Sequence, residues 1–244
     1  MKKAFFKKKV LKVRKKIEFL YKERRRIESI KEYEISLFNN GFQKIAGIDE
    51  VGRGCLAGPV VAAAVVLNNQ ERFFLSHIKD SKKLTQKRRE ELYQLILEKI
   101  PDIGIGMVDS TIIDQLNIAQ ATFLAMKRAI SNLRYLPDYI LVDGFKIPHI
   151  SISQSPLIKG ESKSISIAIA SVVAKVYRDR LMREYHRKFS CYGFDKNVGY
   201  GIRKHLESIK KYGPCDLHRF TFCGVKEKNN NANHSLFLQK RLFN

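Results

Sequence analysis

Two short apolar runs joined by a glycine-rich turn constrain the fold of this chain more than any other feature of its sequence. The first run, at 45–51, carries Asp49 and Glu50 near its end and passes directly into a Gly-Arg-Gly turn at 52–54. The second run, at 60–67, is apolar throughout. The first is rich in β-branched residues, and both are short enough to be buried strands. We therefore expect the two acids to lie where a sheet turns back on itself.

Strand-like and helix-like segments alternate along much of the remaining chain. Short apolar runs predict strands at 103–108 and 139–142, the second of which is followed by Asp143. The residues Ser110 and Thr111 are expected to cap a turn. Helices are predicted at 85–99, 118–133, 165–189 and 203–212. This alternation predicts an α/β fold with a mixed sheet, whose strand ends are natural places for a ligand site.

The charge balance indicates a polyanionic partner. The chain has 244 residues, enough for one main domain with appendages, and its formal net charge is +22. Because binding to such a surface releases the counterions of a polyanion, nucleic acid is the leading candidate. An anionic membrane surface is the rival, although no apolar run approaches the roughly 20 residues of a spanning helix.

Both ends of the chain differ in composition from its centre. Residues 1–31 contain 14 Lys or Arg and 3 Glu, and their apolar residues recur at helical spacing. We therefore predict a basic helical extension at 1–40, which either contacts nucleic acid or is a solvated helix packed on the body. A catalytic domain is predicted at 41–225 and a basic tail at 226–244.

The cysteines indicate a reducing compartment. Cys55, Cys191, Cys215 and Cys223 form no C-x-x-C pair and show no zinc-site spacing. The Lys-rich start of the sequence has no apolar core of the kind found in secretion signals. We expect reduced thiols in a cytoplasmic monomer that does not associate with membranes.

Four carboxylates are candidates for a metal site. Asp49, Glu50, Asp143 and Asp179 all lie next to predicted apolar elements. Crowded carboxylates repel one another unless a cation offsets them, and oxygen ligands suit Mg²⁺ or Mn²⁺. Such ions can activate water for cleavage of a phosphodiester. The spacing alone leaves open that each acid is a turn former or a helix cap.

Several motifs in order resemble the ribonuclease HII family. The sequence Gly-Ile-Asp-Glu-Val-Gly-Arg-Gly at 47–54, continued by Leu-Ala-Gly-Pro and an apolar run to residue 65, is similar to the signature of that family. Further matching motifs lie at 80–84, 121–126, 142–144, 159–164, 174–182, 199–206 and 214–219. The resemblance covers about residues 45–222, a length over which chance matching is negligible.

The resemblance implies a ribonuclease H-like fold with a helical C-terminal part. It also implies an enzyme that hydrolyses the RNA strand of RNA/DNA hybrids and nicks 5′ of a single ribonucleotide in duplex DNA. The four acids match the metal-binding acids of the family. Gly52, Arg53 and Gly54 match the loop that reads the ribose 2′-hydroxyl, and Tyr200 matches the tyrosine that packs on the neighbouring deoxyribose. Lys82 is a candidate phosphate contact, with solvated surface as its alternative reading.

The chain also departs from the family pattern. Cys55 replaces a usual Pro, Phe145 a usual Asn and Ile202 a usual Thr, while Glu161 and Ser162 replace an Asp-Ala type pair. These changes bear on efficiency and substrate preference rather than on the acids. Arg53 and Asp179 argue against the sister enzyme ribonuclease HIII. The alternative outside enzymology is a non-catalytic protein that binds nucleic acid through its basic surface.

Overall fold

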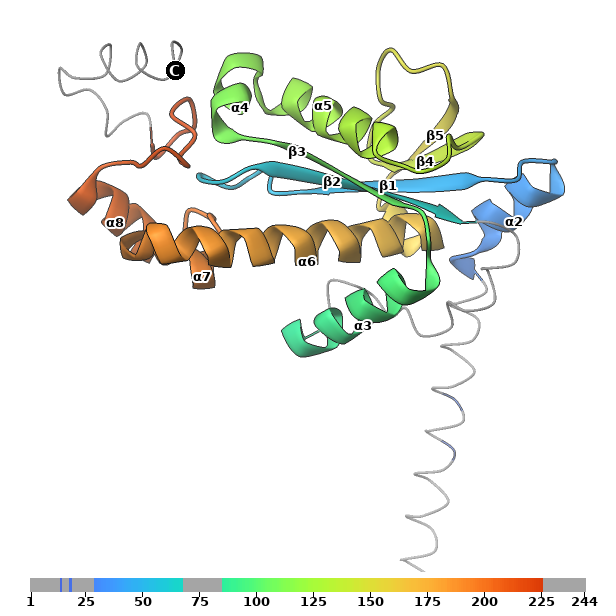
Figure 1. The fold of residues 1–244 in the computed structure, drawn as a ribbon, viewed down its shortest axis with the longest axis horizontal. Coiled ribbons are helices and arrows are strands. Elements are labelled where there is room, and N and C mark those ends of the chain that lie inside the picture. Colours follow the sequence, from blue (N-terminus) through green and yellow to red (C-terminus); the bar gives the residue numbers. More distant parts are fainter. Residues whose placement is uncertain (1–13, 15–17, 19–28, 68–84, 226–244) are drawn as a thin grey trace, which may run out of the picture.

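A computed structural model describes residues 14, 18, 29–67 and 85–225 of the chain (Figure 1). Most of the predicted N-terminal helix, Lys82 and the predicted tail at 226–244 lie outside these residues. Among the described helices, none has both the length and the apolar character needed to cross a membrane.

The centre of the structure is a five-stranded mixed sheet with the order β3-β2-β1-β4-β5. The first three strands in that order are antiparallel neighbours, whereas β1, β4 and β5 run parallel. The mixed sheet expected from the sequence is therefore confirmed. The strands are β1 Ile45–Val51, β2 Val60–Leu67, β3 Ile103–Val108, β4 Tyr139–Asp143 and β5 Ser153–Leu157.

Helices cover both faces of the sheet, so the core has two halves. Figure 1 shows α3 and α6 on one face and α4 and α5 on the other. Because successive strand residues point to opposite faces, Ala63 and Val65 of β2 pack towards α6, whereas Ala62 and Ala64 pack towards α5. Burial on both faces explains why 60–67 is continuously apolar instead of alternating.

The helices agree closely with the sequence prediction, with one correction. Ser110 and Thr111 do not cap a turn but begin α4, whose N-cap is Asp109: its carboxylate accepts a hydrogen bond from the amide of Ile112 at 3.0 Å. The longer helices are α2 Glu32–Asn39, α3 Gln86–Lys99, α4 Ser110–Leu116, α5 Ile118–Ser131, α6 Ile165–Lys188 and α8 Arg203–Tyr212; η3 Gly160–Ser162, η4 Ser190–Tyr192 and α7 Phe194–Asn197 are short.

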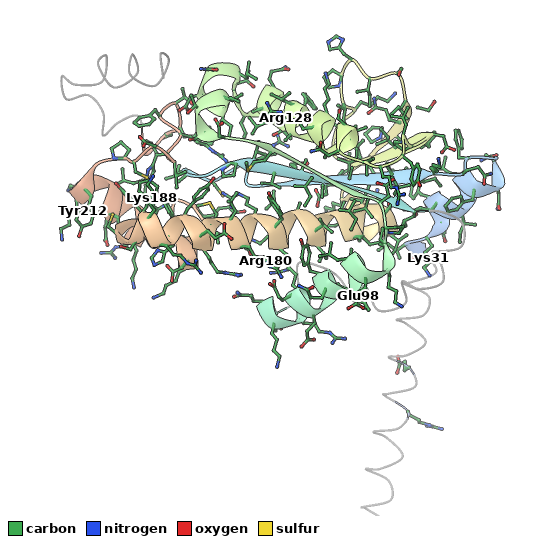
Figure 2. All side chains as sticks on the ribbon, in the orientation of Figure 1. Lys31, Glu98, Arg128, Arg180, Lys188 and Tyr212 are labelled. Atoms are coloured by element: carbon green, nitrogen blue, oxygen red, sulfur yellow. The ribbon has the colours of Figure 1, made fainter. Side chains whose placement is uncertain are left out.

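An ion pair joins α3 to α6. Arg180 extends from α6 on the side where α3 lies (Figure 2), and its Nε donates to Glu90 Oε1 at 2.7 Å. The guanidinium also lies 4.7 Å from the centroid of the Tyr93 ring, within cation–π range. This contact holds α3 against α6. Arg89, the residue before Glu90 on α3, is one of the residues around the candidate site.

Strand β5 has no counterpart in the sequence prediction. Its residues, Ser-Gln-Ser-Pro-Leu, are mostly polar and include Pro156, which lacks a backbone donor. Such a strand is tolerated only at an edge, and β5 is an edge strand of this sheet. Neither alternation nor an apolar run marked it.

A buried glutamate joins α2 to the start of α6. Glu34 Oε1 accepts hydrogen bonds from the amide of Ser166 at 3.0 Å and from its hydroxyl at 2.7 Å, and also from the hydroxyl of Ser164. Ser164 is in turn the N-cap of α6. A negative charge at this position also complements the helix dipole. The end of the predicted extension thus packs on the domain, while the proposed boundary at residue 40 stays a prediction.

The stability of the protein should depend on pH through Glu34. Burial raises the pKa of Glu34 above its ordinary value of 4.5, while the hydrogen bonds from the two serines oppose the rise. The folded state therefore holds this proton to higher pH than the unfolded state does, so the contribution of Glu34 is present at low pH and is lost as the pH rises through the folded-state pKa. From pH 5 to pH 8, the free energy of unfolding of wild type should therefore fall relative to that of Glu34→Gln.

Urea unfolding of both proteins at the two pH values measures this difference. Glu32→Gln is the matched control, since Glu32 lies on the same helix but is exposed. An equal pH dependence in wild type and in Glu34→Gln would contradict the prediction.

Candidate active site

Three acids gather where β1 and β4 end. Asp49 and Glu50 lie near the end of β1, and Asp143 is the last residue of its parallel neighbour β4. The register pairs Ile48 with Val142, so the next residues along, Asp49 and Asp143, are adjacent. All three acids line a cavity of about 430 Å³. The other residues around it are Val51, Gly52, Arg53, Gly54, Arg89, Glu161, Ser171, Lys175 and Tyr200.

The two neighbouring acids of β1 point to opposite sides of the sheet. Asp49 lies on the side of α6 and forms a hydrogen bond with Ser171 of that helix. Glu50, one residue further on, lies on the side of α5 and also lines a second cavity there. Two adjacent acids at the end of β1 thus face opposite sides of the sheet, and Glu50 borders both cavities.

The local electrostatics disfavour charge on these acids. Burial raises the pKa of Asp49 to about 8, and repulsion from Glu50 and Asp143 adds to the rise, while the hydrogen bond with Ser171 opposes it. Burial also raises the pKa of Glu50, against a hydrogen bond from Arg53 that lowers it. A group of carboxylates in a partly dry cavity is unfavourable unless positive charge is supplied.

Asp179 lies two turns after Ser171 on α6. Its Oδ1 accepts from Lys175 Nζ at 2.7 Å, and Lys175 itself lines the cavity. α6 can lie this close to the acids because Gly47 of β1 packs directly on Ser166, where any Cβ would overlap the helix backbone. Asp179 and Lys175 thus form an ion pair across one turn of α6.

The donor set fits a hard divalent cation. As they stand, the side chains within the described residues form no group of three or more His, Cys, Asp or Glu residues that could hold a metal ion. Two of the acids are instead neutralised by ion pairs. Arg53 Nη1 lies 3.1 Å from Glu50 Oε1, and Lys175 Nζ lies 2.7 Å from Asp179 Oδ1. Yet Glu50 Oε2 is buried without a hydrogen-bond partner, and oxygen donors suit Mg²⁺ or Mn²⁺.

The buried Arg219 bonds the 52–54 turn, and the buried Arg178 packs beside Gly52. Arg219 donates to the carbonyls of Gly52 at 2.6 Å and Arg53 at 2.8 Å. Arg178 of α6 donates to the carbonyls of residues 57, 59 and 198. The φ of Gly52 is +94°, and a Cβ there would overlap the guanidinium of Arg178. Only glycine fits this position, and the carbonyls of residues 52 and 53 are fixed towards the interior by Arg219.

Tyr200 borders the same cavity with its side chain 40% exposed. Its backbone carbonyl bonds to His205 Nδ1 at 2.8 Å, and His205 Nε2 lies 3.1 Å from His218 Nε2. Burial lowers the pKa of His205. Both histidines are thus engaged in hydrogen bonds inside the structure. Cys55, the replacement for the usual Pro, is buried and contacts Tyr200.

Comparison with known families identifies the chain. The sequence profile described as Ribonuclease HII matches residues 46–225, which include all three acids of the strand ends, Asp179, the 52–54 turn and Tyr200. The chain belongs to the ribonuclease HII family.

Close relatives carry the same description. A ribonuclease HII of Caldanaerobacter subterraneus subsp. tengcongensis is 50% identical over 204 residues, which cover 84% of this chain and 84% of the relative. A ribonuclease HII of Bacillus subtilis is 50% identical over 194 residues, covering 80% and 75%.

Solved structures share the fold. The ribonuclease H2 of Pyrococcus horikoshii superposes with a TM-score of 0.67 at 25% identity, covering 80% of this chain and 98% of that one. A structure of Bst-RNase HIII in complex with Mn²⁺ gives 0.61 at 20% identity, covering 82% and 71%, and so shows the fold alone. The ribonuclease H-like fold expected from the sequence is confirmed.

Sequence reasoning found most of the residues around this ribonuclease HII cavity but not all of them. It singled out the three acids, the 52–54 turn and Tyr200. It assigned no role in the site to Arg89, Ser171, Arg178 or Arg219, although the last two lie inside motifs that match the family. Lys82 lies outside the described residues, so its role stays a prediction.

Proposed function

We propose that the chain is a metal-dependent endoribonuclease that hydrolyses the RNA strand of RNA/DNA hybrids and nicks duplex DNA 5′ of a single ribonucleotide. Cleavage leaves 3′-hydroxyl and 5′-phosphate ends. The observation that carries the proposal is one cavity bordered both by crowded, buried carboxylates and by a glycine turn beside an exposed tyrosine. Membership of the ribonuclease HII family supports the same activity.

The acids are the proposed ligands of Mg²⁺ or Mn²⁺. Asp49, Glu50, Asp143 and Asp179 would hold the ions, which supply an activated water and stabilise the leaving oxygen. Asp49 is the central ligand in this proposal, since it is the most buried of the four and is repelled by two of the others. Ser171 orients its carboxylate from α6. Lys175, released from Asp179, would face the phosphate from the same cavity wall.

The 52–54 turn and Tyr200 are the proposed readers of the sugars. Only the 2′-hydroxyl distinguishes RNA from DNA at a given nucleotide, and a turn without side chains on its glycines lets backbone groups approach it closely. Arg219 holds the carbonyls of residues 52 and 53 towards the interior, so the opposite side of the turn faces the cavity. Tyr200 would pack on the deoxyribose that follows the ribonucleotide.

The remaining expectations are part of the same proposal. We propose a cytoplasmic monomer with no membrane association; the four cysteines, all of which the structure describes, form no disulfide. A non-catalytic nucleic-acid-binding protein would need only the basic surface. Buried carboxylates would weaken such a protein's hold on a polyanion, so the cavity favours the enzyme.

A duplex with a single ribonucleotide tests the activity. With Mg²⁺ or Mn²⁺ the protein should nick this duplex 5′ of the ribonucleotide, and chelation of the ion should abolish the nick because the acids then lack their counter-charge. Denaturing electrophoresis of an end-labelled strand locates the break, and an all-DNA duplex of the same sequence is the control. Equal cutting of both duplexes, or cutting unaffected by chelator, would overturn the proposal.

A further inference from the structure

A second, smaller cavity adjoins the candidate active site on the α5 side of the sheet. Its volume is about 130 Å³, and it shares Glu50, Arg53 and Asp143 with the larger cavity. The residues that it does not share are Ala119, Thr122, Phe123, Met126 and Phe145. A group bound in the smaller cavity would therefore contact the same acids as a group bound in the larger one. It would lie on the opposite side of these acids from Tyr200.

Phe145 is fixed at the mouth of this cavity by the backbone. The amide of Phe145 donates to the carbonyl of Asp143 at 3.2 Å, across a turn in which Gly144 has a φ of +81°. The amide of Gly144 donates to the carbonyl of Leu157 at 3.1 Å. Phe145 is 69% exposed even though it lies two residues from the partly buried Asp143. An exposed aromatic ring next to a reaction site is suited to packing on a substrate.

The part of the cavity wall that α5 contributes offers little to a hydroxyl group. Phe123 and Met126 of α5 form its apolar part. The Thr122 hydroxyl already donates to the carbonyl of Ile118 at 2.7 Å, and Arg53 is paired with Glu50 at 3.1 Å. At about 30 Å³ for each water, the cavity holds roughly four water-sized groups, which is room for part of a sugar ring.

We propose that Phe145 and this cavity receive the sugar of the nucleotide immediately 5′ of the cleaved phosphate and select deoxyribose over ribose there. The inference rests on the proposed function, in which the acids hold the cleaved phosphate and the turn with Tyr200 holds the 3′ side. The strand must then continue past the acids in the other direction, towards Phe145. A 2′-hydroxyl pressed against the apolar wall would lose its hydrogen bonds to water.

Two duplexes that differ by one oxygen atom test the proposal. Both carry the same ribonucleotide at the cleaved junction; the nucleotide before it is deoxyribose in one and ribose in the other. Wild type should cleave the junction of the first duplex with a kcat/KM about fivefold higher than that of the second. This ratio is at the low end of the range expected for an unsatisfied hydroxyl, because Phe145 is partly exposed and so leaves the hydroxyl some access to water. In Phe145→Asn, whose amide can bond the hydroxyl, the ratio should fall to about one, and Phe145→Tyr should keep most of it.

Leu136→Ala is the matched control, since Leu136 is 72% exposed and lies outside both cavities. Its ratio should equal that of wild type. A ratio taken on one preparation is independent of the fraction folded. If wild type nicks neither duplex, the proposed function fails and this inference with it. If wild type nicks both at equal rates, or Phe145→Asn keeps the wild-type ratio, only the sugar selection is overturned.

Discussion

Asp49→Asn should lose cleavage by about a thousandfold or more in kcat while keeping its affinity for the duplex. Asp49 is buried at the point where β1 and β4 end, and its carboxylate is repelled by the carboxylates of Glu50 and Asp143. The amide keeps the shape and the hydrogen bond with Ser171 but removes the charge that an ion requires, and the loss of such charge stabilisation in a water-poor site is of this order. Single-turnover cleavage and fluorescence anisotropy of the labelled duplex measure the two quantities separately.

The same variant separates chemistry from folding. Removing a charge that is disfavoured by burial should not lower the thermal unfolding midpoint. Asp195→Asn, which alters a partly exposed carboxylate of α7 that is paired with His186, is the control and should retain cleavage. Full activity in Asp49→Asn would remove this residue from the proposed site, and a lowered midpoint would mean that the loss of cleavage reflects damage to the fold.

Gly52→Ala should both destabilise the protein and lower cleavage of the single-ribonucleotide duplex by about a hundredfold. The backbone at Gly52 has a φ of +94°, and a Cβ would overlap Arg178 and lie 2.8 Å from the carbonyl oxygen of Pro59. Strain of this kind costs about 1 to 3 kcal/mol, which corresponds to a midpoint lower by roughly 2 to 12 °C in a domain of this size. A turn displaced by about 1 Å misplaces the sugar, and errors of that size cost on the order of a hundredfold in rate.

Gly54→Ala provides the comparison within the same turn. A Cβ at Gly54 meets no atom within 4 Å, so its unfolding midpoint should match that of wild type. Differential scanning calorimetry of the two variants, together with cleavage of the same duplex, completes the test. Equal midpoints for Gly52→Ala and Gly54→Ala would show that the turn is not held as tightly as its contacts with the arginines indicate.

The parts of the fold that the sequence predicted are those whose signals are local. The continuous apolar run of β2 and the small residues of α6 each carry their own pattern, so these elements could be located. The acids at the ends of β1 and β4 could be located because they follow short apolar runs. The strand β5 could not, because its polar residues and Pro156 are explained only by its position at the sheet edge. The order of the strands is a property of pairing between distant segments.

The support of the candidate site was likewise hidden in long-range contacts. Arg219 bonds the carbonyl of Gly52 across 167 positions of sequence, and Arg178 bonds that of Pro59 across 119. A basic residue in a chain with a net charge of +22 would ordinarily be expected at the surface, yet both arginines are fully buried. The resemblance to ribonuclease HII located the turn itself, whereas only the structure shows which side chains hold its carbonyls.

The contact between Arg219 and the 52–54 turn also has a consequence for biosynthesis. The turn is translated early, but the guanidinium that fixes its carbonyls is added 167 residues later. At about 5 to 20 residues per second, a ribosome needs roughly 8 to 33 seconds to cover that distance. Until then a nascent chain would lack the finished 52–54 turn, which we propose reads the sugar. Selectivity for ribonucleotides would therefore be acquired only when the catalytic domain is nearly complete, and chains that terminate before Arg219 would lack it.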